Sequence, residues 1–151
     1  MNSEHIGDEA GSSGIRTAML PRAQSVRWPA IEWDDDGYPV GEDDDFADYA
    51  SLPLDFEAAA RFLLAELPAA ATQCCCWCEV TDDVDYMGGK QVRRITFSTG
   101  GWSGAESLIA FIERRMDTAH FMVSWRRGGH YVFEVPKRLL ALSTPSQEHR
   151  E

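Results

Sequence analysis

The feature that most constrains the fold is the hydrophobic period, which changes several times after residue 55. Apolar residues first recur at helical spacing between Phe56 and Leu67, where they form one continuous stripe. Asp55 has the side chain of a helix N-cap, and Pro68 is expected to stop the helix. The pattern therefore predicts a first helix from Phe56 to Leu67.

Two strands are predicted after this helix. Cys74 to Thr81 has strand character, and Lys90 to Thr99 is its expected antiparallel partner. Side chains alternate along a strand, so the second strand should direct one set to the core and another set away from it. The core set is Ile95 and Phe97, and the opposite set is Arg94, Thr96 and Ser98.

A second helix is predicted after Gly100 and Gly101. Ser103 and Glu106 have the spacing of a capping box, in which each side chain accepts from the other residue's backbone N–H. The buried stripe of this helix is expected to consist of Ala105, Leu108, Ile109, Ile112 and Met116.

The last unit is a β-hairpin. His120 to Arg127 and His130 to Val135 flank Gly128-Gly129, which suits a two-residue turn with positive φ. Such a turn predicts these cross-strand pairs: Trp125 with Val132, Val123 with Glu134, Arg126 with Tyr131, Ser124 with Phe133, and Met122 with Val135. Both faces are partly apolar, so the hairpin is expected at the centre of the sheet. A short helical turn, Lys137 to Leu142, should follow Pro136.

The order helix, two strands, helix, two strands predicts an α+β fold. We expect a mainly antiparallel sheet of about four strands, with two helices packed on one face. Residues 53–142 should form this single domain. Residues 1–25 lack a hydrophobic period and are expected to be disordered, and residues 143–151 should form a loose tail.

Charge is distributed unevenly along the chain. Residues 1–60 contain 14 acidic and 3 basic residues, a net charge of −11, whereas residues 61–151 contain 11 of each. We call residues 26–52 the acidic-aromatic arm, because nine carboxylates between Glu32 and Asp48 alternate with aromatic residues. Self-repulsion should keep this arm extended. The sequence leaves open whether it is a solvated leader or folds on the domain.

An acidic arm on a neutral domain disfavours direct binding of nucleic acid and favours a basic protein surface as partner. The candidate partner-binding residues are Glu32, Trp33, Asp34, Asp35, Asp36, Tyr38, Asp43, Asp44 and Asp45. Apolar runs fall far short of the roughly 20 residues of a membrane span, and Met1 to Gly14 lacks the apolar core of a secretory signal. A cytoplasmic protein of unspecified oligomeric state is expected.

Two motifs, Ser98-Thr99-Gly100-Gly101-Trp102-Ser103-Gly104 and Trp125-Arg126-Arg127-Gly128-Gly129-His130-Tyr131, resemble those of small proteins of unassigned function encoded by tailed bacteriophages and prophages. The segment Trp33-Asp34-Asp35-Asp36-Gly37 fits the same group, and the resemblance covers roughly residues 30 to 136. It carries no catalytic residues. Because accessory phage genes often encode inhibitors of host enzymes or defence systems, it implies a non-catalytic, protein-binding role in the host cytoplasm.

A second hypothesis is a small nucleotide- or anion-binding protein, or an enzyme. Backbone N–H groups of Gly100, Gly101, Trp102, Ser103 and Gly104 lie between a strand and a helix, where they can hold an anion. Arg126, Arg127 and His130 would add donors if the hairpin lies beside them. The loop lacks the lysine of a Walker motif and the spacing of a dinucleotide fingerprint, so catalysis is not favoured and no cofactor is predicted.

Three further patterns are weaker. Ser103 and His130 only distantly resemble a nucleophile and its base. The cysteines at 74, 75, 76 and 78 are too close together to staple the fold, and core packing is favoured over zinc. Carboxylates from Glu32 to Asp43 have the spacing of a calcium loop, but nearby prolines oppose the flanking helices. No metal site is predicted.

Overall fold

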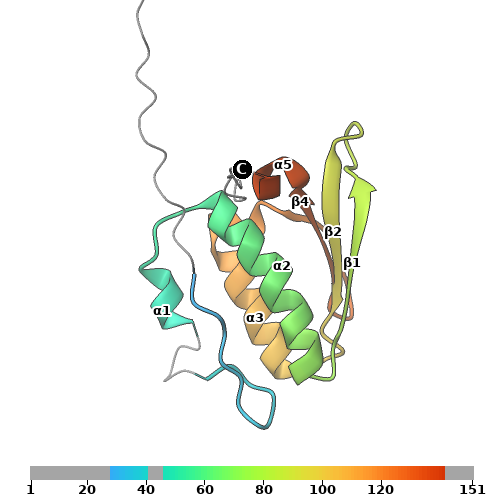
Figure 1. The fold of residues 1–151 in the computed structure, drawn as a ribbon. Helices are drawn as coiled ribbons and strands as arrows, with labels where there is room; N and C mark the ends of the chain where they lie inside the picture. Colours follow the sequence, from blue (N-terminus) through green and yellow to red (C-terminus); the bar gives the residue numbers. More distant parts are fainter. Residues whose placement is uncertain (1–27, 41–45, 142–151) are drawn as a thin grey trace, which may run out of the picture.

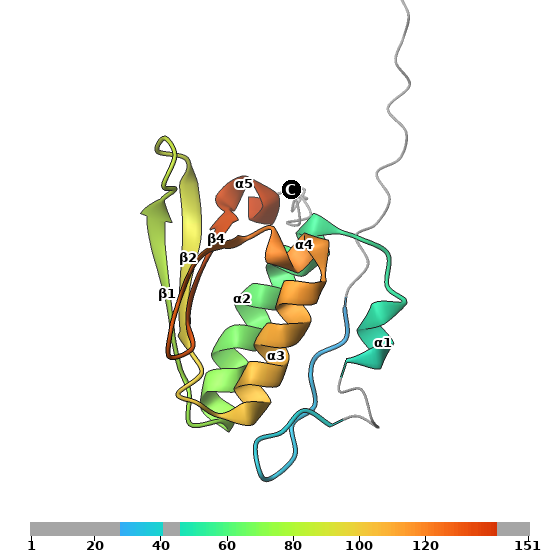
Figure 2. The same ribbon diagram turned by 180° about the vertical axis from the view of Figure 1, so that it is seen from behind.

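In the computed structural model, residues 28–40 and 46–141 are described (Figure 1). Four strands form one antiparallel sheet in the order β1-β2-β4-β3. The strands are β1 (Trp77–Val84), β2 (Gln91–Ser98), β3 (Met122–Arg126) and β4 (His130–Pro136). Helices α2 (Phe56–Gln73) and α3 (Ser103–Arg114) lie side by side on one face of the sheet (Figures 1 and 2). The predicted α+β fold is confirmed.

Three short helices complete the described part of the chain: α1 (Ala47–Ala50), α4 (Met116–Ala119) and α5 (Lys137–Ala141). The last of these confirms the helical turn predicted after Pro136. None of the described helices is long and apolar enough to cross a membrane. The segments predicted to be disordered or loose, residues 1–25 and 143–151, lie outside the described residues.

Helix α2 begins as predicted and continues further. The carboxylate of Asp55 accepts from the backbone N–H of Ala58 over 3.0 Å, which makes it the N-cap. The predicted end at Leu67 is wrong, because Pro68 lies inside the helix. Proline costs a helix about 3 kcal/mol. The fully buried Ala70 extends the apolar stripe beyond Leu67, and this packing favours continuation past the proline.

The pairing of β1 with β2 follows the predicted arrangement, with Val80 opposite Ile95. However, β1 begins at Trp77 rather than at Cys74. Residues 74–76 form the connection between α2 and β1. The buried residues Ile95 and Phe97 lie in the core beneath the helices. Arg94, Thr96 and Ser98 are half-buried and alternate with this core set, as predicted.

The predicted register of the last hairpin is wrong by one residue. Its turn contains three residues, Arg127, Gly128 and Gly129, with φ of +89° and +76° at the two glycines. The observed pairs are Arg126 with His130, Trp125 with Tyr131, Ser124 with Val132 and, beyond a bulge, Met122 with Phe133. None of the predicted pairs occurs: not Trp125 with Val132, Val123 with Glu134, Arg126 with Tyr131, Ser124 with Phe133, or Met122 with Val135.

The hairpin is also only half central. Strand β4 lies between β2 and β3, but β3 is at the edge of the sheet. A short strand that carries a bulge suits such a position, because both features limit further strand pairing.

The predicted capping box of α3 is wrong. Trp102 occupies the N-cap position, and its side chain makes no capping hydrogen bond. The hydroxyl of Ser103 instead pairs with the hydroxyl of Tyr38 over 3.1 Å. The predicted stripe is buried except at its last position, since the helix ends at Arg114 and Met116 is 68% exposed in α4.

Candidate functional site

The described parts of the acidic-aromatic arm pack on the domain. Trp28, Phe46 and Tyr49 are all buried in the same core as α2 and α3. Phe46 stacks on Phe111 of α3 with ring centroids 4.6 Å apart and planes inclined by 17°. The question that the sequence leaves open is thereby answered for residues 28–40 and 46–52: their aromatic side chains belong to the fold.

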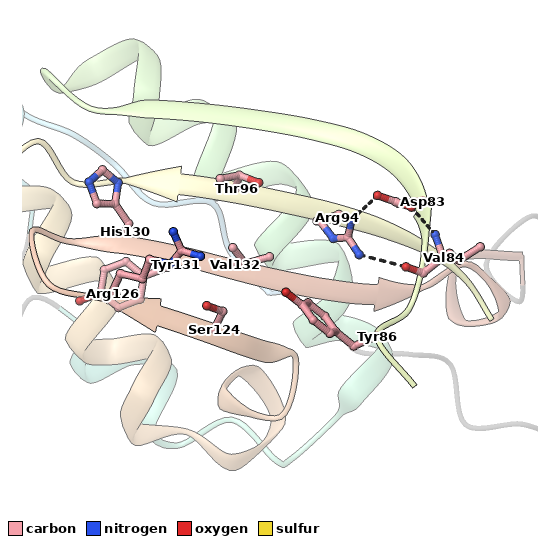
Figure 3. Close-up of a pocket in the computed structure, with 10 residues that line it drawn as sticks. All are labelled: Asp83, Val84, Tyr86, Arg94, Thr96, Ser124, Arg126, His130, Tyr131 and Val132. Atoms are coloured by element: carbon pink, nitrogen blue, oxygen red, sulfur yellow. Dashed lines mark hydrogen bonds and ion pairs between the residues drawn. The ribbon is translucent and has the colours of Figure 1, made fainter. Parts of the chain in front are cut away.

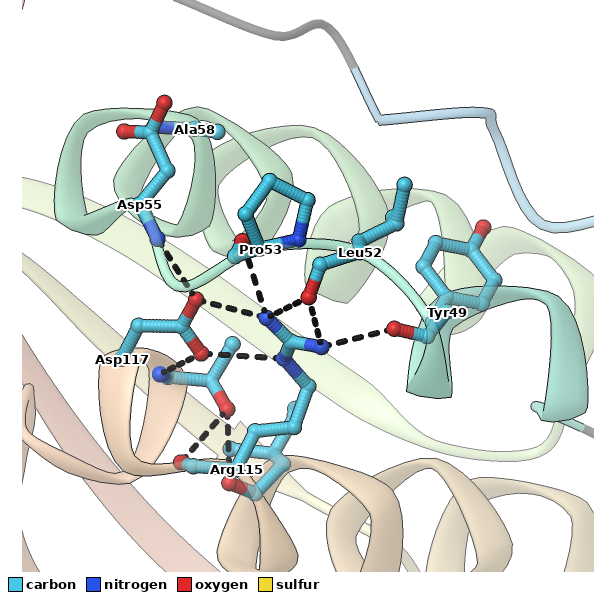
Figure 4. A network of polar contacts seen from close by, with 9 residues as sticks. Tyr49, Leu52, Pro53, Asp55, Ala58, Arg115 and Asp117 are labelled. Atoms are coloured by element: carbon cyan, nitrogen blue, oxygen red, sulfur yellow. Dashed lines mark hydrogen bonds and ion pairs between the residues drawn. The ribbon is translucent and has the colours of Figure 1, made fainter.

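The ion pair between Arg115 and Asp117 contacts the C-terminal end of the acidic-aromatic arm and holds it on the domain (Figure 4). The guanidinium of Arg115 donates to the carbonyl oxygen of Tyr49 over 2.6 Å and to the carboxylate of Asp117 over 2.8 Å. It also lies 4.6 Å from the centroid of the Trp28 ring. Asp117 is fully buried and accepts from the backbone N–H of Asp55 over 3.0 Å.

The electrostatics of Asp117 reflect this arrangement. Burial alone would raise the pKa of the Asp117 carboxyl, but the hydrogen bonds from Arg115 and from backbone N–H groups hold that pKa below its usual value. The pair is therefore ionised when the protein is folded, and it ties the start of α4 to the chain between α1 and α2.

Residues 32–40, which we call the acidic loop, form a closed turn. Trp33 and Pro39 make an antiparallel bridge, and the backbone N–H of Val40 donates to the carbonyl oxygen of Glu32 over 2.8 Å. One carboxylate oxygen of Asp34 accepts from the N–H groups of Asp36 and Tyr38 over 3.0 and 2.8 Å. These contacts fix the backbone of the loop locally.

The acidic loop docks where α2 ends and α3 begins (Figures 1 and 2). The carbonyl oxygen of Gly37 accepts from the indole N–H of Trp102 over 3.1 Å and from the thiol of Cys74 over 3.2 Å. The ring of Tyr38 lies 5.6 Å from that of Trp102. A Cβ added at Gly37 would lie 2.9 Å from the carbonyl oxygen of Gln73, so the contact requires glycine.

The carboxylates of the acidic loop remain in solvent. Glu32, Asp34, Asp35 and Asp36 are all exposed, and none of them forms an ion pair with a basic side chain in the described part of the chain. The arginines nearest the fold's interior are paired elsewhere, Arg94 with Asp83 and Glu134, and Arg115 with Asp117. Asp43, Asp44 and Asp45 lie outside the described residues.

The two halves of the predicted anion site touch at one point but do not line a common groove. The backbone N–H of Thr99 donates to the carbonyl oxygen of Gly129 over 3.0 Å, so the glycine-rich loop and the hairpin turn do touch. Arg126 and His130, however, line a groove that includes no residue of 100–104. A Cβ at Gly104 would overlap the carbonyl oxygen of Gly37, so the acidic loop covers the first turn of α3.

The remaining predicted residues of this set are placed as follows. Gly100 and Gly101 form the turn before α3, both with positive φ, and Trp102 and Ser103 contact the acidic loop. Arg127 is an exposed residue of the hairpin turn. Ser103 bonds Tyr38 while His130 belongs to the groove, so the two do not form a nucleophile and base pair.

The four cysteines are free thiols, and all but Cys75 are half-buried. Burial raises the pKa of Cys76 to about 12 and that of Cys78 to about 11, and both side chains pack against the core. Burial also raises the pKa of Cys74. A thiol with a raised pKa carries little thiolate near neutral pH. Among the described residues no group of three metal-binding side chains gathers at one point.

Of the residues that line the groove, sequence reasoning singled out only Arg126 and His130 for binding. It missed the others, among them Asp83, Tyr86, Arg94, Thr96 and Ser124. Their shared location depends on the strand register, which local patterns did not predict. Comparison of the chain with protein-family models, with curated proteins and with solved structures finds no match. Function is therefore argued from the geometry of the acidic loop and of the groove.

Proposed function

We propose that the protein is a non-catalytic interaction protein whose acidic loop binds a basic surface on a protein partner. The carboxylates of Glu32, Asp34, Asp35 and Asp36 supply the charge, and Asp43, Asp44 and Asp45 extend the acidic run along the chain. One observation carries this proposal: the loop backbone is held by half-buried donors of the domain, while its carboxylates are exposed and form no ion pair among the described residues.

Rigid display of charge favours binding. A loop that is already ordered loses less conformational entropy on association than a free arm would. The exposed carboxylates also create a negative potential that accelerates the encounter with a positively charged surface. Trp33 and Tyr38 act as anchors to the domain in this proposal, since Trp33 packs against the core and Tyr38 lies against Trp102.

The partner that suits such a loop is a protein that handles nucleic acid. Closely spaced carboxylates present negative charge as a phosphate backbone does, and a groove built for phosphates is lined by Lys and Arg. The resemblance to phage accessory proteins supports a partner in the host, such as a defence protein, that would be inhibited by occupation of its groove. The part of the chain from residue 61 onward has no net charge, so the attraction comes from the arm.

The proposal is tested by affinity capture from host lysate, followed by binding measurements with the purified partner. The variant Asp35→Asn/Asp36→Asn removes two exposed charges, and Glu79→Gln/Glu113→Gln removes two exposed charges elsewhere on the domain as a matched control. The first should weaken binding roughly tenfold, because each exposed ion pair contributes up to about 1 kcal/mol. The control should bind as wild type does.

Two further measurements address the mechanism. Binding should weaken steeply with added salt, and duplex DNA should compete with the protein for its partner. Affinity that is unchanged by salt, or equal affinities for the two double variants, would show that the acidic loop does not drive the interaction.

A further inference from the structure

A groove of about 620 Å³ lies on the sheet face opposite α2 and α3 (Figure 3). The residues that line it come from all four strands, including Asp83 and Val84 of β1, and from the connection between β1 and β2. The residues that matter for binding are Tyr86, Arg94, Thr96, Ser124, Arg126 and His130. Among the described elements, no long helix covers this face (Figures 1 and 2).

The strand register orders these side chains into three rows. Arg94 lies opposite Glu134, Val132 lies between Thr96 and Ser124, and His130 lies opposite Arg126. Successive rows are two residues apart along β4, which corresponds to about 7 Å. The groove floor thus has an ion-paired end, a hydroxyl-bearing middle and an end formed by Arg126 and His130.

The end formed by Arg126 and His130 contains no ion pair among the described residues. Arg126 and His130 are both exposed and are direct neighbours across β3 and β4. Neither forms an ion pair within residues 28–40 and 46–141, whereas Arg93 and Arg94 on β2 are paired with Asp82 and Asp83. Although the whole chain has a net charge of −11, no carboxylate of the described residues pairs with Arg126 or His130. The two side chains are therefore available to an anion from solution. A guanidinium binds a phosphate through two parallel hydrogen bonds.

The opposite end is held by ion pairs and is aromatic, and its one guanidinium and two carboxylates, Arg94, Asp83 and Glu134, leave a net charge of −1. Arg94 donates to the carbonyl oxygen of Val84 over 2.9 Å and to Glu134 over 2.8 Å, and it also pairs with Asp83. The ring of Tyr86 lies 6.0 Å from this guanidinium and is 77% exposed. An exposed ring beside a fixed cation is a surface on which a flat aromatic group stacks.

We propose that this groove binds a nucleoside monophosphate. The phosphate lies at Arg126 and His130, the sugar hydroxyls at Thr96 and Ser124, and the base on Tyr86. The site is independent of the proposed role of the acidic loop, since the two lie on opposite sides of the sheet. A longer nucleic acid is disfavoured, because the exposed carboxylate of Glu79 on β1 would repel the phosphates of neighbouring nucleotides.

Isothermal titration calorimetry on the full chain tests this proposal. The probes are the four ribonucleoside monophosphates, ribose 5-phosphate and inorganic phosphate. At least one nucleotide should bind about tenfold or more tightly than ribose 5-phosphate, because stacking of one base contributes about 1–3 kcal/mol. Amide shifts in NMR spectra should move at Thr96, Ser124 and Val132 rather than in residues 34–40.

Two variants separate the ends of the groove. Arg126→Gln should weaken nucleotide and inorganic phosphate together, by about tenfold or more. Tyr86→Ala should weaken the nucleotide about tenfold and leave phosphate unchanged. Arg138→Gln, which removes an exposed charge on α5 outside the groove, is the matched control and should bind as wild type does.

Three results would overturn the proposal. The first is the absence of nucleotide binding, the second is equal affinity for nucleotide and inorganic phosphate, and the third is wild-type affinity in both groove variants. Arg126 and Tyr86 are exposed, so both variants should fold, and circular dichroism verifies this before titration.

Discussion

The indole N–H of Trp102 donates to the carbonyl oxygen of Gly37 over 3.1 Å, across 65 positions of the chain. This contact joins the N-cap of α3 to the tip of the acidic loop. It explains how a segment rich in carboxylates becomes part of the fold: the backbone carbonyl and the neighbouring aromatic rings bind the domain, and the charged groups do not.

Trp102→Phe removes this donor and keeps the aromatic ring. We expect a loss of about 1 kcal/mol in the free energy of unfolding, the typical net contribution of one hydrogen bond. Hydrogen exchange of the amides of Tyr38 and Val40 should accelerate, because the loop opens more often. Trp77→Phe, at an indole that is 52% exposed on β1, is the control. Equal exchange in the two variants would mean that the indole does not hold the loop.

Gly37→Ala tests the close approach of the loop to α2. Gly37 has φ of +82°, and an added Cβ would lie 2.9 Å from the carbonyl oxygen of Gln73. Gly89 has φ of +83° with open space around it, so Gly89→Ala has the same backbone strain without the contact. The control should lose about 1 kcal/mol in urea denaturation, and Gly37→Ala should lose clearly more. Equal losses would contradict a tight docking of the loop.

Arg115→Ala removes the cation from a fully buried carboxylate. The uncompensated charge of Asp117 should cost about 3–5 kcal/mol of unfolding free energy. Arg114→Ala, an exposed neighbour in α3, should change stability by less than about 0.5 kcal/mol. Thermal unfolding of both variants measures the difference. A small effect of Arg115→Ala would indicate that the arm is held by its aromatic side chains alone.

Local periodicity predicted the long elements well, because a stripe or an alternation requires only neighbours in sequence. The errors arose where tertiary packing or a contact with a residue far away in the sequence determines the local structure. Pro68 stays helical because the turn that follows it, with the fully buried Ala70, packs in the core. Ser103 makes a hydrogen bond with Tyr38 in place of a capping contact. Neither the packing of Ala70 in the core nor the contact of Ser103 with Tyr38 can be inferred from the neighbouring residues alone. One feature of the sequence could have indicated that the acidic loop docks on the domain: Gly37 lies among interleaved aromatic residues.

The groove was not predicted from the sequence because the turn of the last hairpin is one residue longer than expected. With a two-residue turn, Arg126 would lie opposite Tyr131, and Arg126 and His130 would not be direct neighbours. With the three-residue turn, Arg126 lies opposite His130 and Ser124 lies beside Val132. A shift of one residue moves side chains to the other face of a sheet, so an error in turn length rearranges a whole surface.

Glu66 provides a prediction on pH. It is 7% exposed in α2 and accepts from the backbone N–H of Ile31 over 3.3 Å. Burial raises the pKa of its carboxyl above 4.5, and the hydrogen bond from Ile31 lowers it by less. The unfolded chain therefore releases this proton more readily than the folded protein. The protonated carboxyl of Glu66 therefore contributes its full share of the free energy of unfolding below about pH 4.5. This contribution is lost as the pH rises through the pKa of the folded protein.

Glu66→Gln removes this titration and retains an oxygen that accepts from Ile31. Relative to wild type, the variant should gain stability as pH rises from 4 to 8 in urea denaturation, by about 1.4 kcal/mol for each unit by which folding raises the pKa. Glu113→Gln changes an exposed carboxylate on α3, and its difference from wild type should follow pH less steeply. A wild-type advantage that grows with pH would show that the carboxylate of Glu66 is stabilised rather than penalised in the fold. The contact between Ile31 and α2 would then depend on that charge.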